Sequence, residues 1–232
     1  MTADIAYHLT ELKIVSNKGD PRRIVPNYSC GGWRVLDIGC GIGQTLVSEE
    51  LSEATELYGV DSDSELVNCP VLTDREPRLR LIHAAAESLP FPGTYFDLVY
   101  SRVAVPYTNI PVAMSEAFRV LKPGGHLWMT LHPWRMGMKR LLSAIIARKP
   151  RALADRLYVL ASSLLFACSG RLAPRPWDGT YESLQTAYAM RRVLARAGFV
   201  GTRCQISRSI FLVTASKPAG HDTVREPQSI HA

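Results

Sequence analysis

Short apolar runs alternate with longer amphipathic stretches along most of this chain. Four runs are compact and end at glycine or polar residues, as buried parallel strands do. They cover residues 33–38, 57–60, 79–84 and 95–101. A fifth, 126–131, follows a Lys-Pro-Gly-Gly turn at 122–125. Strands that alternate with helices predict a mainly parallel sheet covered on both faces.

The stretches between these strands have helical spacing of apolar positions. We expect helices over 43–50, 110–121 and 181–197, the last ending at Gly198. Residues 1–32 predict a short amphipathic helix with Ile5, Leu9 and Leu12 on one face, followed by a connection rich in Gly, Pro and Arg.

The end of the chain predicts a different pairing. The β-rich runs 202–207 and 209–215 are too close in sequence for a helical crossover, so we expect an antiparallel hairpin. Residues 217–232 are polar, contain two prolines and are expected to form a disordered tail. We therefore expect one domain over 1–216.

Composition excludes several classes of protein. The chain has 232 residues, 47% of them hydrophobic, and five widely spaced cysteines without a CxxC pair, so neither a disulfide framework nor a structural metal site is predicted. No apolar stretch follows a basic start at the N-terminus, and no uncharged run reaches the roughly 18 residues of a membrane span. We expect a cytoplasmic protein, peripheral at most to the inner face of the membrane.

The positive charge is concentrated in one segment. Residues 134–176 carry nine bases and one acid, a local charge of +8, whereas the rest of the chain sums to −2. Within it, 138–148 and a helix after Pro150 that includes 157–168 have amphipathic or apolar helical patterns. Three interpretations stay open for this basic helical insertion, 134–179: a lid over an acceptor pocket, contact with an anionic membrane surface, or a homodimer interface.

Glycines and two acids gather where the first strand ends. Residues 37–43 read Asp-Ile-Gly-Cys-Gly-Ile-Gly, and Asp61 ends the second strand. Gln44 occupies the place of the last glycine in a dinucleotide fingerprint, and the P-loop lysine is absent. A carboxylate such as Asp61 can accept both hydroxyls of a ribose. The alternatives are that the glycines only form turns and that Asp61 only caps a helix over 62–67.

Four ordered motifs carry a family resemblance. VLDIGCGIGQTL, YGVDSD, AAAESLPFPGTYFDLVYS and EAFRVLKPGG together resemble the class I S-adenosylmethionine-dependent methyltransferases, in the branch with a Leu-Pro-Phe motif that contains many small-molecule enzymes. The resemblance implies an α/β, Rossmann-like, doubly wound sheet of seven strands in the order 3-2-1-4-5-7-6, with the last strand antiparallel and the helical insertion after strand five.

The resemblance also implies the cofactor S-adenosyl-L-methionine, which leaves as S-adenosyl-L-homocysteine, and a binding set. By similarity that set is Asp37, Gly39, Cys40, Gly41, Gly43, Asp61, Ser62, Ala86, Glu87 and Ser101. Asp37 and Gly39 would lie by the methionine part, Asp61 would hold the ribose, and Ser101 would lie beside the sulfonium. The family often has Asp where Ala85 stands, so the backbone of Ala86, the Glu87 carboxylate or a water would recognise the adenine amine instead. We expect Cys40 to serve packing and not as a nucleophile.

Methyl transfer from a sulfonium mainly needs alignment of acceptor, methyl and sulfur, and exclusion of water. A general base is needed only if the acceptor must lose a proton. Candidates near the carboxyl ends of the strands are His132, Tyr107 and Arg102, and also His8 or Tyr7 if the N-terminal helix folds over the site. His132 can equally be a loop residue that bonds the backbone, and Arg102 can pair with an anionic acceptor or with an acid of the protein.

The sequence thus predicts an enzyme that methylates a small, apolar or lipid-like acceptor. An alternative is a catalytically silent protein that binds the cofactor or its product and acts as a partner or regulator. RNA or protein methylation is a further alternative. Nucleic acid is disfavoured because no aromatic residues interleave the bases and no Asn-Pro-Pro-Tyr type motif follows the fourth strand.

Overall fold

The computed structural model describes residues 3–132, 150–206 and 210–220. The first 131 residues hold five strands with helices or turns between most of them, and the described residues after 131 add two helices and two strands. The elements are α1 (Ala3–Ser16), β1 (Arg34–Ile38), η1 (Glu49–Leu51), β2 (Glu56–Asp61), α2 (Ser64–Val67), α3 (Pro70–Thr73), β3 (Leu79–His83), β4 (Phe96–Arg102), η2 (Val105–Tyr107), α4 (Ile110–Val120), β5 (Leu121–Leu131), α6 (Pro150–Ser169), α7 (Ala187–Ala197), β6 (Val200–Ile206) and β7 (Phe211–Ser216).

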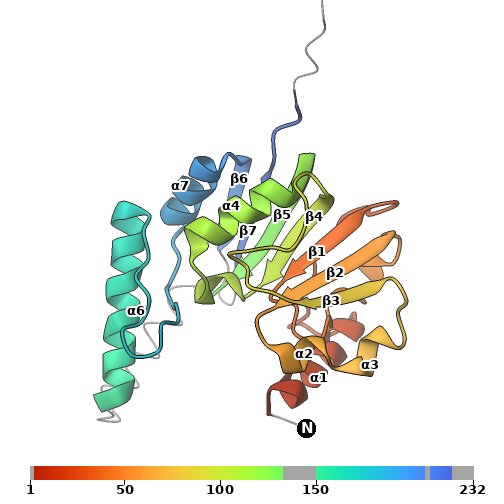
Figure 1. Ribbon diagram of the computed structural model, residues 1–232, viewed down its shortest axis with the longest axis horizontal. Coiled ribbons are helices and arrows are strands. Elements are labelled where there is room, and N and C mark those ends of the chain that lie inside the picture. The colour runs from red at the N-terminus through yellow and green to blue at the C-terminus, as the bar shows by residue number, and fades with distance from the viewer. Residues whose placement is uncertain (1–2, 133–149, 207–209, 221–232) are drawn as a thin grey trace, which may run out of the picture.

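The strands form one seven-stranded sheet in the order β3-β2-β1-β4-β5-β7-β6, which confirms the predicted topology. β1 to β5 are parallel, and β7 runs antiparallel between β5 and β6. The register places Asp37 opposite Gly59 and Val35 opposite Leu98. The carboxyl ends of β1, β2 and β4 therefore lie side by side at one edge of the sheet (Figure 1).

Each face of the sheet has its own hydrophobic core. One core lies between the sheet and the helices α4 and α7, and it includes Phe96, Phe211 and, from α6, Phe166. The other is covered by the segment after β1, by α2 and α3, and by the predicted apolar face of α1. Figure 1 shows α4 and α7 against the sheet and α6 outside α7, at the side of the molecule.

The segment predicted as a helix over 43–50 is not one. Gly43 has a left-handed φ of +85°, and Ser48 is extended with φ −69° and ψ 151°. Neither conformation continues an α-helix. The backbone instead makes successive turns, such as Leu46 N–H to the Gly43 carbonyl (3.0 Å), before the 3₁₀ turn η1.

Two other elements begin at a different residue from the one predicted. The helix expected over 181–197 begins at Ala187, because Thr186 is extended and its hydroxyl caps the helix by accepting from the Ala189 N–H at 3.2 Å. Its end at Gly198, with a left-handed φ of +103°, is as predicted. The strand expected over 126–131 already begins at Leu121, which pairs with Phe96.

The predicted second helix of the basic insertion is α6, whereas the helix predicted over 138–148 lies outside the described residues, as does most of the predicted tail. Two arginines of α7 hold the end of α6. The Arg192 guanidinium donates to the Cys168 carbonyl (2.6 Å), and Arg196 donates to the Ser169 carbonyl (3.0 Å). α6 thus packs along α7 and not on the sheet itself.

Replacing Gly59 by alanine should destabilise the fold. A Cβ atom there would lie 2.6 Å from the Cys40 Sγ and 2.8 Å from a Leu81 methyl carbon, so buried neighbours must shift. We expect Gly59→Ala to lower the free energy of unfolding by about 1–3 kcal/mol in urea denaturation. Gly31→Ala is the matched control, because its Cβ would lie 3.8 Å from the nearest atom, and an equal loss in both variants would contradict this packing argument.

Candidate active site

Two adjoining cavities open at the carboxyl edge of the sheet. The first, of about 290 Å³, is lined mainly by the ends of β1 and β2 and by residues 84–87 after β3. The second, of about 510 Å³, lies between the ends of β1 and β4 and the helix α1. Gly39, Asp61, Ala104 and Tyr107 line both cavities, so the two form one continuous candidate site of the size that small molecules occupy.

The glycine loop after β1 is fixed to the end of β2. The amides of Gly39 and Cys40 both donate to the Val60 carbonyl, at 2.8 and 3.0 Å, and the Gly41 amide donates to the Asp61 Oδ2 at 2.8 Å. Gly39 has a left-handed φ of +76°, and a Cβ atom there would overlap the Cβ atom of Ala104. A glycine is therefore required where the loop passes between the two cavities.

Asp61 sits at the junction of the cavities and is not a helix cap. Its Oδ1 accepts from the Asp63 amide at 3.0 Å, and Asp63 itself caps α2 by accepting from the Glu65 amide at 2.8 Å. The alternative in which Asp61 caps this helix is therefore wrong. Each oxygen of Asp61 accepts one backbone bond and has a second lone pair available for a ligand.

Asp37 is a buried carboxyl group in the wall of the second cavity. It is 2% exposed, and its Oδ1 has no hydrogen-bond partner among the described residues. Burial raises its pKa to about 7, an effect that the neighbouring Tyr100 hydroxyl and the Arg102 charge offset only in part. The Oε1 of Gln44, in the same wall, is a second buried acceptor without a partner in the described structure. These two atoms suit a ligand that brings hydrogen-bond donors.

Four predicted cofactor residues, Cys40, Gly41, Gly43 and Ser101, line neither cavity, and three of them serve packing. Cys40 is 1% exposed, and burial raises the pKa of its thiol well above the usual value, so it remains protonated. Gly43 packs against Leu79 and Leu81. The Ser101 hydroxyl donates to the Ile38 carbonyl at 2.7 Å and joins β4 to β1. A role for these residues at the cofactor stays a prediction.

The predicted adenine-side residues line the first cavity: Ser62, Ala85, Ala86 and Glu87. The Glu87 Oε1 accepts from the Asn109 amide at 2.6 Å, just before α4. Glu87 thus also holds the start of α4. Ala86 is buried in the core, so only its backbone is suited to meet a ligand.

The helix α1 forms a wall of the second cavity, which fulfils the condition set for Tyr7 and His8. Both line it, together with Glu11 one turn further along the same helix face. The His8 ring lies directly against Gly41, and its Nδ1 is 3.1 Å from the Gln44 Nε2. Burial lowers the pKa of His8, against the opposing effect of Asp61, so the imidazole is mostly uncharged at neutral pH.

All three predicted catalytic residues line the second cavity: Arg102, Tyr107 and His132. Arg102 is engaged within the protein, because its guanidinium pairs with Glu11 at 2.9 Å and donates to the Thr45 hydroxyl at 3.0 Å. Sequence reasoning missed Glu11, Gln44 and Thr45. The helical spacing of Tyr7, His8 and Glu11 is the signal that places Glu11 on the same face as the two named candidates.

The predicted lid is not seen over the site in the described part of the insertion, since no residue of 150–179 lines either cavity. Residues 134–149 lie outside the described residues, so the lid stays a prediction for them.

The groups that line the two cavities fit the predicted cofactor. The close approach at Gly39 leaves backbone and not side chain at the junction, the Asp61 carboxylate faces both cavities, and the buried Asp37 Oδ1 needs a donor such as an ammonium group. A nucleoside in the first cavity and an amino acid chain toward Asp37 would satisfy these groups.

Comparison with known proteins agrees with this geometry. The family described as "Methyltransferase domain" matches residues 36–129. The chain is similar to a demethylmenaquinone methyltransferase of Geobacillus, with 29% identity over 47% of this chain and 50% of that protein. It is also similar to the uncharacterized methyltransferase YcgJ of Bacillus subtilis, with 35% identity over 43% of this chain and 40% of that protein. The chain thus spans about half the length of these curated relatives or less.

Among solved structures, an S-adenosylmethionine-dependent methyltransferase from Mesorhizobium loti shares the fold, with a TM-score of 0.58 and 18% identity over 82% of this chain and 93% of that one. The motifs, the strand order and the matched domain agree, and they confirm the predicted resemblance and the predicted cofactor, S-adenosylmethionine. Residues 36–129 therefore match a methyltransferase domain, and the sheet that contains them has the fold of class I, S-adenosylmethionine-dependent methyltransferases.

Proposed function

We propose that this protein transfers a methyl group from S-adenosylmethionine to a small, apolar or lipid-like acceptor. The observation that carries the proposal is the pair of cavities joined at Gly39 and Asp61, one suited to a nucleoside and one open to the predicted catalytic residues. When bound, the cofactor supplies an electrophilic methyl group on a sulfonium. Everything else that the reaction needs is positioning, and that falls to the protein.

The first cavity and the loop would hold the cofactor. The free lone pairs of Asp61 would accept hydrogen bonds from the ribose hydroxyls, and the glycine loop, fixed to Val60, would keep its backbone in place. The Asp37 Oδ1, which has no partner among the described residues, would accept a hydrogen bond from the ammonium group. Because all three elements are held in advance, little ordering is needed on binding.

The second cavity would take the methionine part of the cofactor beside Asp37 and the acceptor in the space that remains. Its walls combine hydrocarbon and aromatic groups, including Leu66, Val103 and Tyr107, with a few polar side chains, as small-molecule sites do. At about 510 Å³, it suits a compact ring or chain and not a folded macromolecule. Relatives in Geobacillus and Listeria are named demethylmenaquinone methyltransferases, which supports a lipid-like quinone as the acceptor class.

Proton removal, where the acceptor requires it, is assigned to His132. It follows β5 at the edge where the cavities meet the strand ends, and it lines the acceptor side. His8 is the second candidate, since it is mostly uncharged at neutral pH but its ring lies against the glycine loop. Arg102, held by Glu11, supplies positive charge in the wall without needing an anionic acceptor.

Asp61→Asn tests the cofactor site. The amide keeps one acceptor but loses the second oxygen that a ribose diol uses, so we expect at least about tenfold weaker binding of S-adenosylhomocysteine by calorimetry. Asp63→Asn is the matched control, because asparagine caps α2 as well as aspartate does and the residue lines neither cavity. Undetectable binding by the native protein would argue against both an active enzyme and a silent binding protein.

Asp37 predicts a pH dependence of binding. Its carboxyl pKa of about 7 means that the free protein is largely protonated there at about pH 6 and ionised at about pH 8. An ammonium ligand favours the carboxylate, so the affinity for S-adenosylhomocysteine should rise by about tenfold over this range, with proton release. Asp37→Asn should flatten the profile.

The raised pKa of Asp37 also affects the stability of the ligand-free protein: stability should fall with rising pH, whereas ligand affinity should rise. Because the folded pKa lies above the unfolded value of 3.8, the ligand-free protein loses stability as the pH rises from about 4 to about 7. Asp37→Asn should reduce that slope in urea denaturation. A slope that is unchanged in the variant would show that Asp37 titrates normally.

His132→Gln tests the acceptor side. With an acceptor that must lose a proton, we expect kcat to fall by about 100-fold and the rise of kcat with pH to disappear, while cofactor affinity stays the same. His126→Gln, which lines neither cavity, is the matched control. Labelled methyl groups should enter a lipid extract and not bulk RNA or protein, and the reverse distribution would exclude the proposed acceptor class.

A further inference from the structure

The helix α6 has an apolar face that no other described part of the chain covers. Leu157, Leu164 and Leu165 are 54%, 66% and 41% exposed. The exposed residues between and around them are Ala154, Ala161 and Cys168. These six positions recur at helical spacing and form one stripe, which we call the outer face of α6. Large side chains exposed together in this way mark a contact surface.

The opposite side of α6 is anchored in the domain. Phe166 and Val159 are 1% and 3% exposed, and the guanidinium groups of Arg192 and Arg196 bind the carbonyls at the end of the helix. Arg156 near its start pairs with Glu182 at 3.2 Å. Residues 151–169 are long and apolar enough to cross a membrane by length and composition. Spanning would break these attachments, so a position on the membrane and not across it fits the structure.

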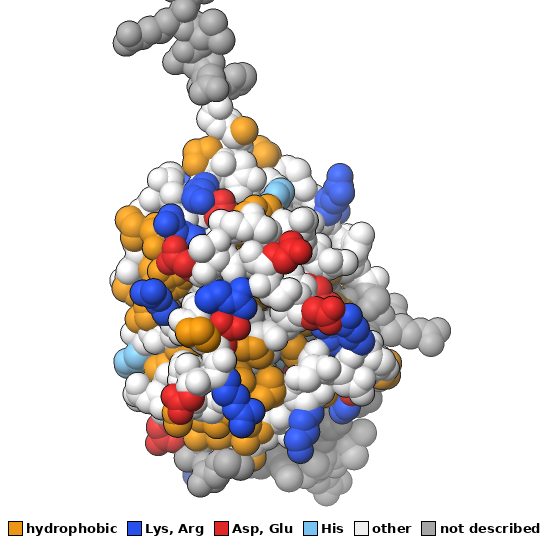
Figure 2. Space-filling view, turned by 90° about the vertical axis from the view of Figure 1, so that its right-hand side faces the viewer, with side chains coloured by type: hydrophobic (Ala, Val, Ile, Leu, Met, Phe, Trp, Pro, Cys, Tyr) orange, Lys and Arg blue, Asp and Glu red, His pale blue; other side chains and the backbone are white. Residues whose placement is uncertain are grey.

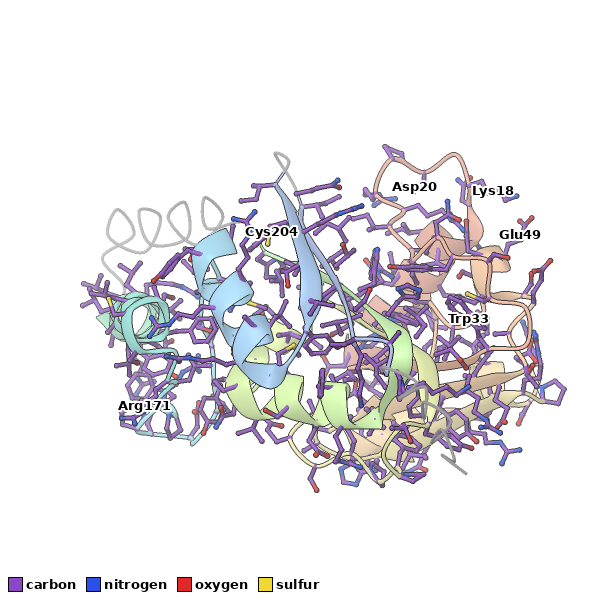
Figure 3. All side chains as sticks on the ribbon, turned by 90° about the horizontal axis from the view of Figure 1, so that it is seen from above. Lys18, Asp20, Trp33, Glu49, Arg171 and Cys204 are labelled. Atoms are coloured by element: carbon purple, nitrogen blue, oxygen red, sulfur yellow. The ribbon has the colours of Figure 1, made fainter. Side chains whose placement is uncertain are left out.

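Positive charge flanks the outer face at both ends. Arg151 and Arg171 are exposed at the start of α6 and just after its end, and Figure 3 shows Arg171 at the side of the molecule where α6 lies. Trp177, 55% exposed, stands edge-on to Tyr158 with the Arg175 guanidinium 5.8 Å from its ring. Arginine and tryptophan beside exposed leucines are typical of a protein surface at a lipid interface.

Another face of the molecule differs in charge pattern. Figure 2 shows acids and bases intermingled on the side of the sheet that carries β3. On the outer face of α6 no described residue is acidic, and the one acid of the helix, Asp155, is only half-exposed. Two copies packed through this face in a twofold arrangement would bring arginines together with no acid to pair with them. Anionic lipid supplies the missing negative charge.

A short path of contacts joins α6 to the cavities. The Ser163 hydroxyl accepts from the Leu184 amide at 2.8 Å, and the neighbouring Ser183 amide donates to the Pro106 carbonyl at 3.1 Å. Pro106 precedes Tyr107, which lines both cavities. The outer face of α6 and the mouth of the site are thus fixed relative to each other.

We propose that the outer face of α6 docks on the surface of an anionic lipid bilayer. The leucines enter the interfacial region, and Arg151 and Arg171 meet the headgroups. The docking surface does not depend on the proposed reaction. Its use, delivery of a lipid-like acceptor from the bilayer to the second cavity, rests on the proposed function.

The test is co-sedimentation of the full chain with vesicles that contain about 30 mol% phosphatidylglycerol in phosphatidylcholine. We expect binding that weakens with added salt and is at least about tenfold weaker on phosphatidylcholine alone. Leu157→Gln with Leu164→Gln should reduce binding at least about tenfold, as should Arg151→Gln with Arg171→Gln. Val112→Gln, at a position 42% exposed on α4, is the matched control and should bind like the native protein.

S-adenosylhomocysteine affinity and methyl transfer to a detergent-dispersed acceptor, measured on the same variants, separate the two proposals. Unchanged values with lost vesicle binding support docking as a distinct property, and vesicle binding without any cofactor binding would refute the proposed function alone. Native protein that ignores the anionic vesicles, or leucine variants that bind them fully, would overturn the docking proposal. So would a dimer, seen by analytical ultracentrifugation, that the leucine variants dissociate.

Discussion

The site depends on the attachment of the glycine loop to the end of β2. Three successive amides, those of Gly39, Cys40 and Gly41, donate to the Val60 carbonyl and the Asp61 carboxylate at 2.8–3.0 Å. These bonds decide where β1 ends and hold Asp61 at the junction of the two cavities. They form only because Gly59 and Gly39 let Cys40 and Ala104 approach the backbone closely. The conformation of the loop is therefore set by packing against β2 and Ala104, and the candidate binding site depends on that packing.

Much of this arrangement could be predicted from local sequence. The strands, the terminal hairpin and the position of Asp61 follow from short apolar runs, and the strand order follows from the family resemblance; the structure confirms them. The prediction of a helix over 43–50 was wrong, because Gly43 is left-handed and Ser48 is extended where the loop packs on the sheet. The spacing of apolar residues alone does not show where tertiary packing replaces a helix by turns.

The acceptor side was less accessible to sequence reasoning. His8 and Gln44 lie 36 positions apart, and Glu11 and Arg102 lie 91 apart, so no local pattern pairs them. The side-chain roles of Ser101 and Glu87 were also hidden, because each bonds a distant backbone group. In the same way, the basic segment predicted α6 correctly as a helix, but its place beside α7 depends on Phe166 and on two arginines of another helix.

The pairing of Glu11 with Arg102 also bears on how the chain folds. A helix near the beginning of the chain completes its cavity wall only against a strand that follows it by 91 positions. During synthesis on the ribosome, α1 therefore emerges long before its partner, with the apolar side chains of Ile5, Leu9 and Leu12 still lacking the core they later join. Closure of the cavity therefore becomes a late folding event, because α1 cannot complete its wall until β4 has been made.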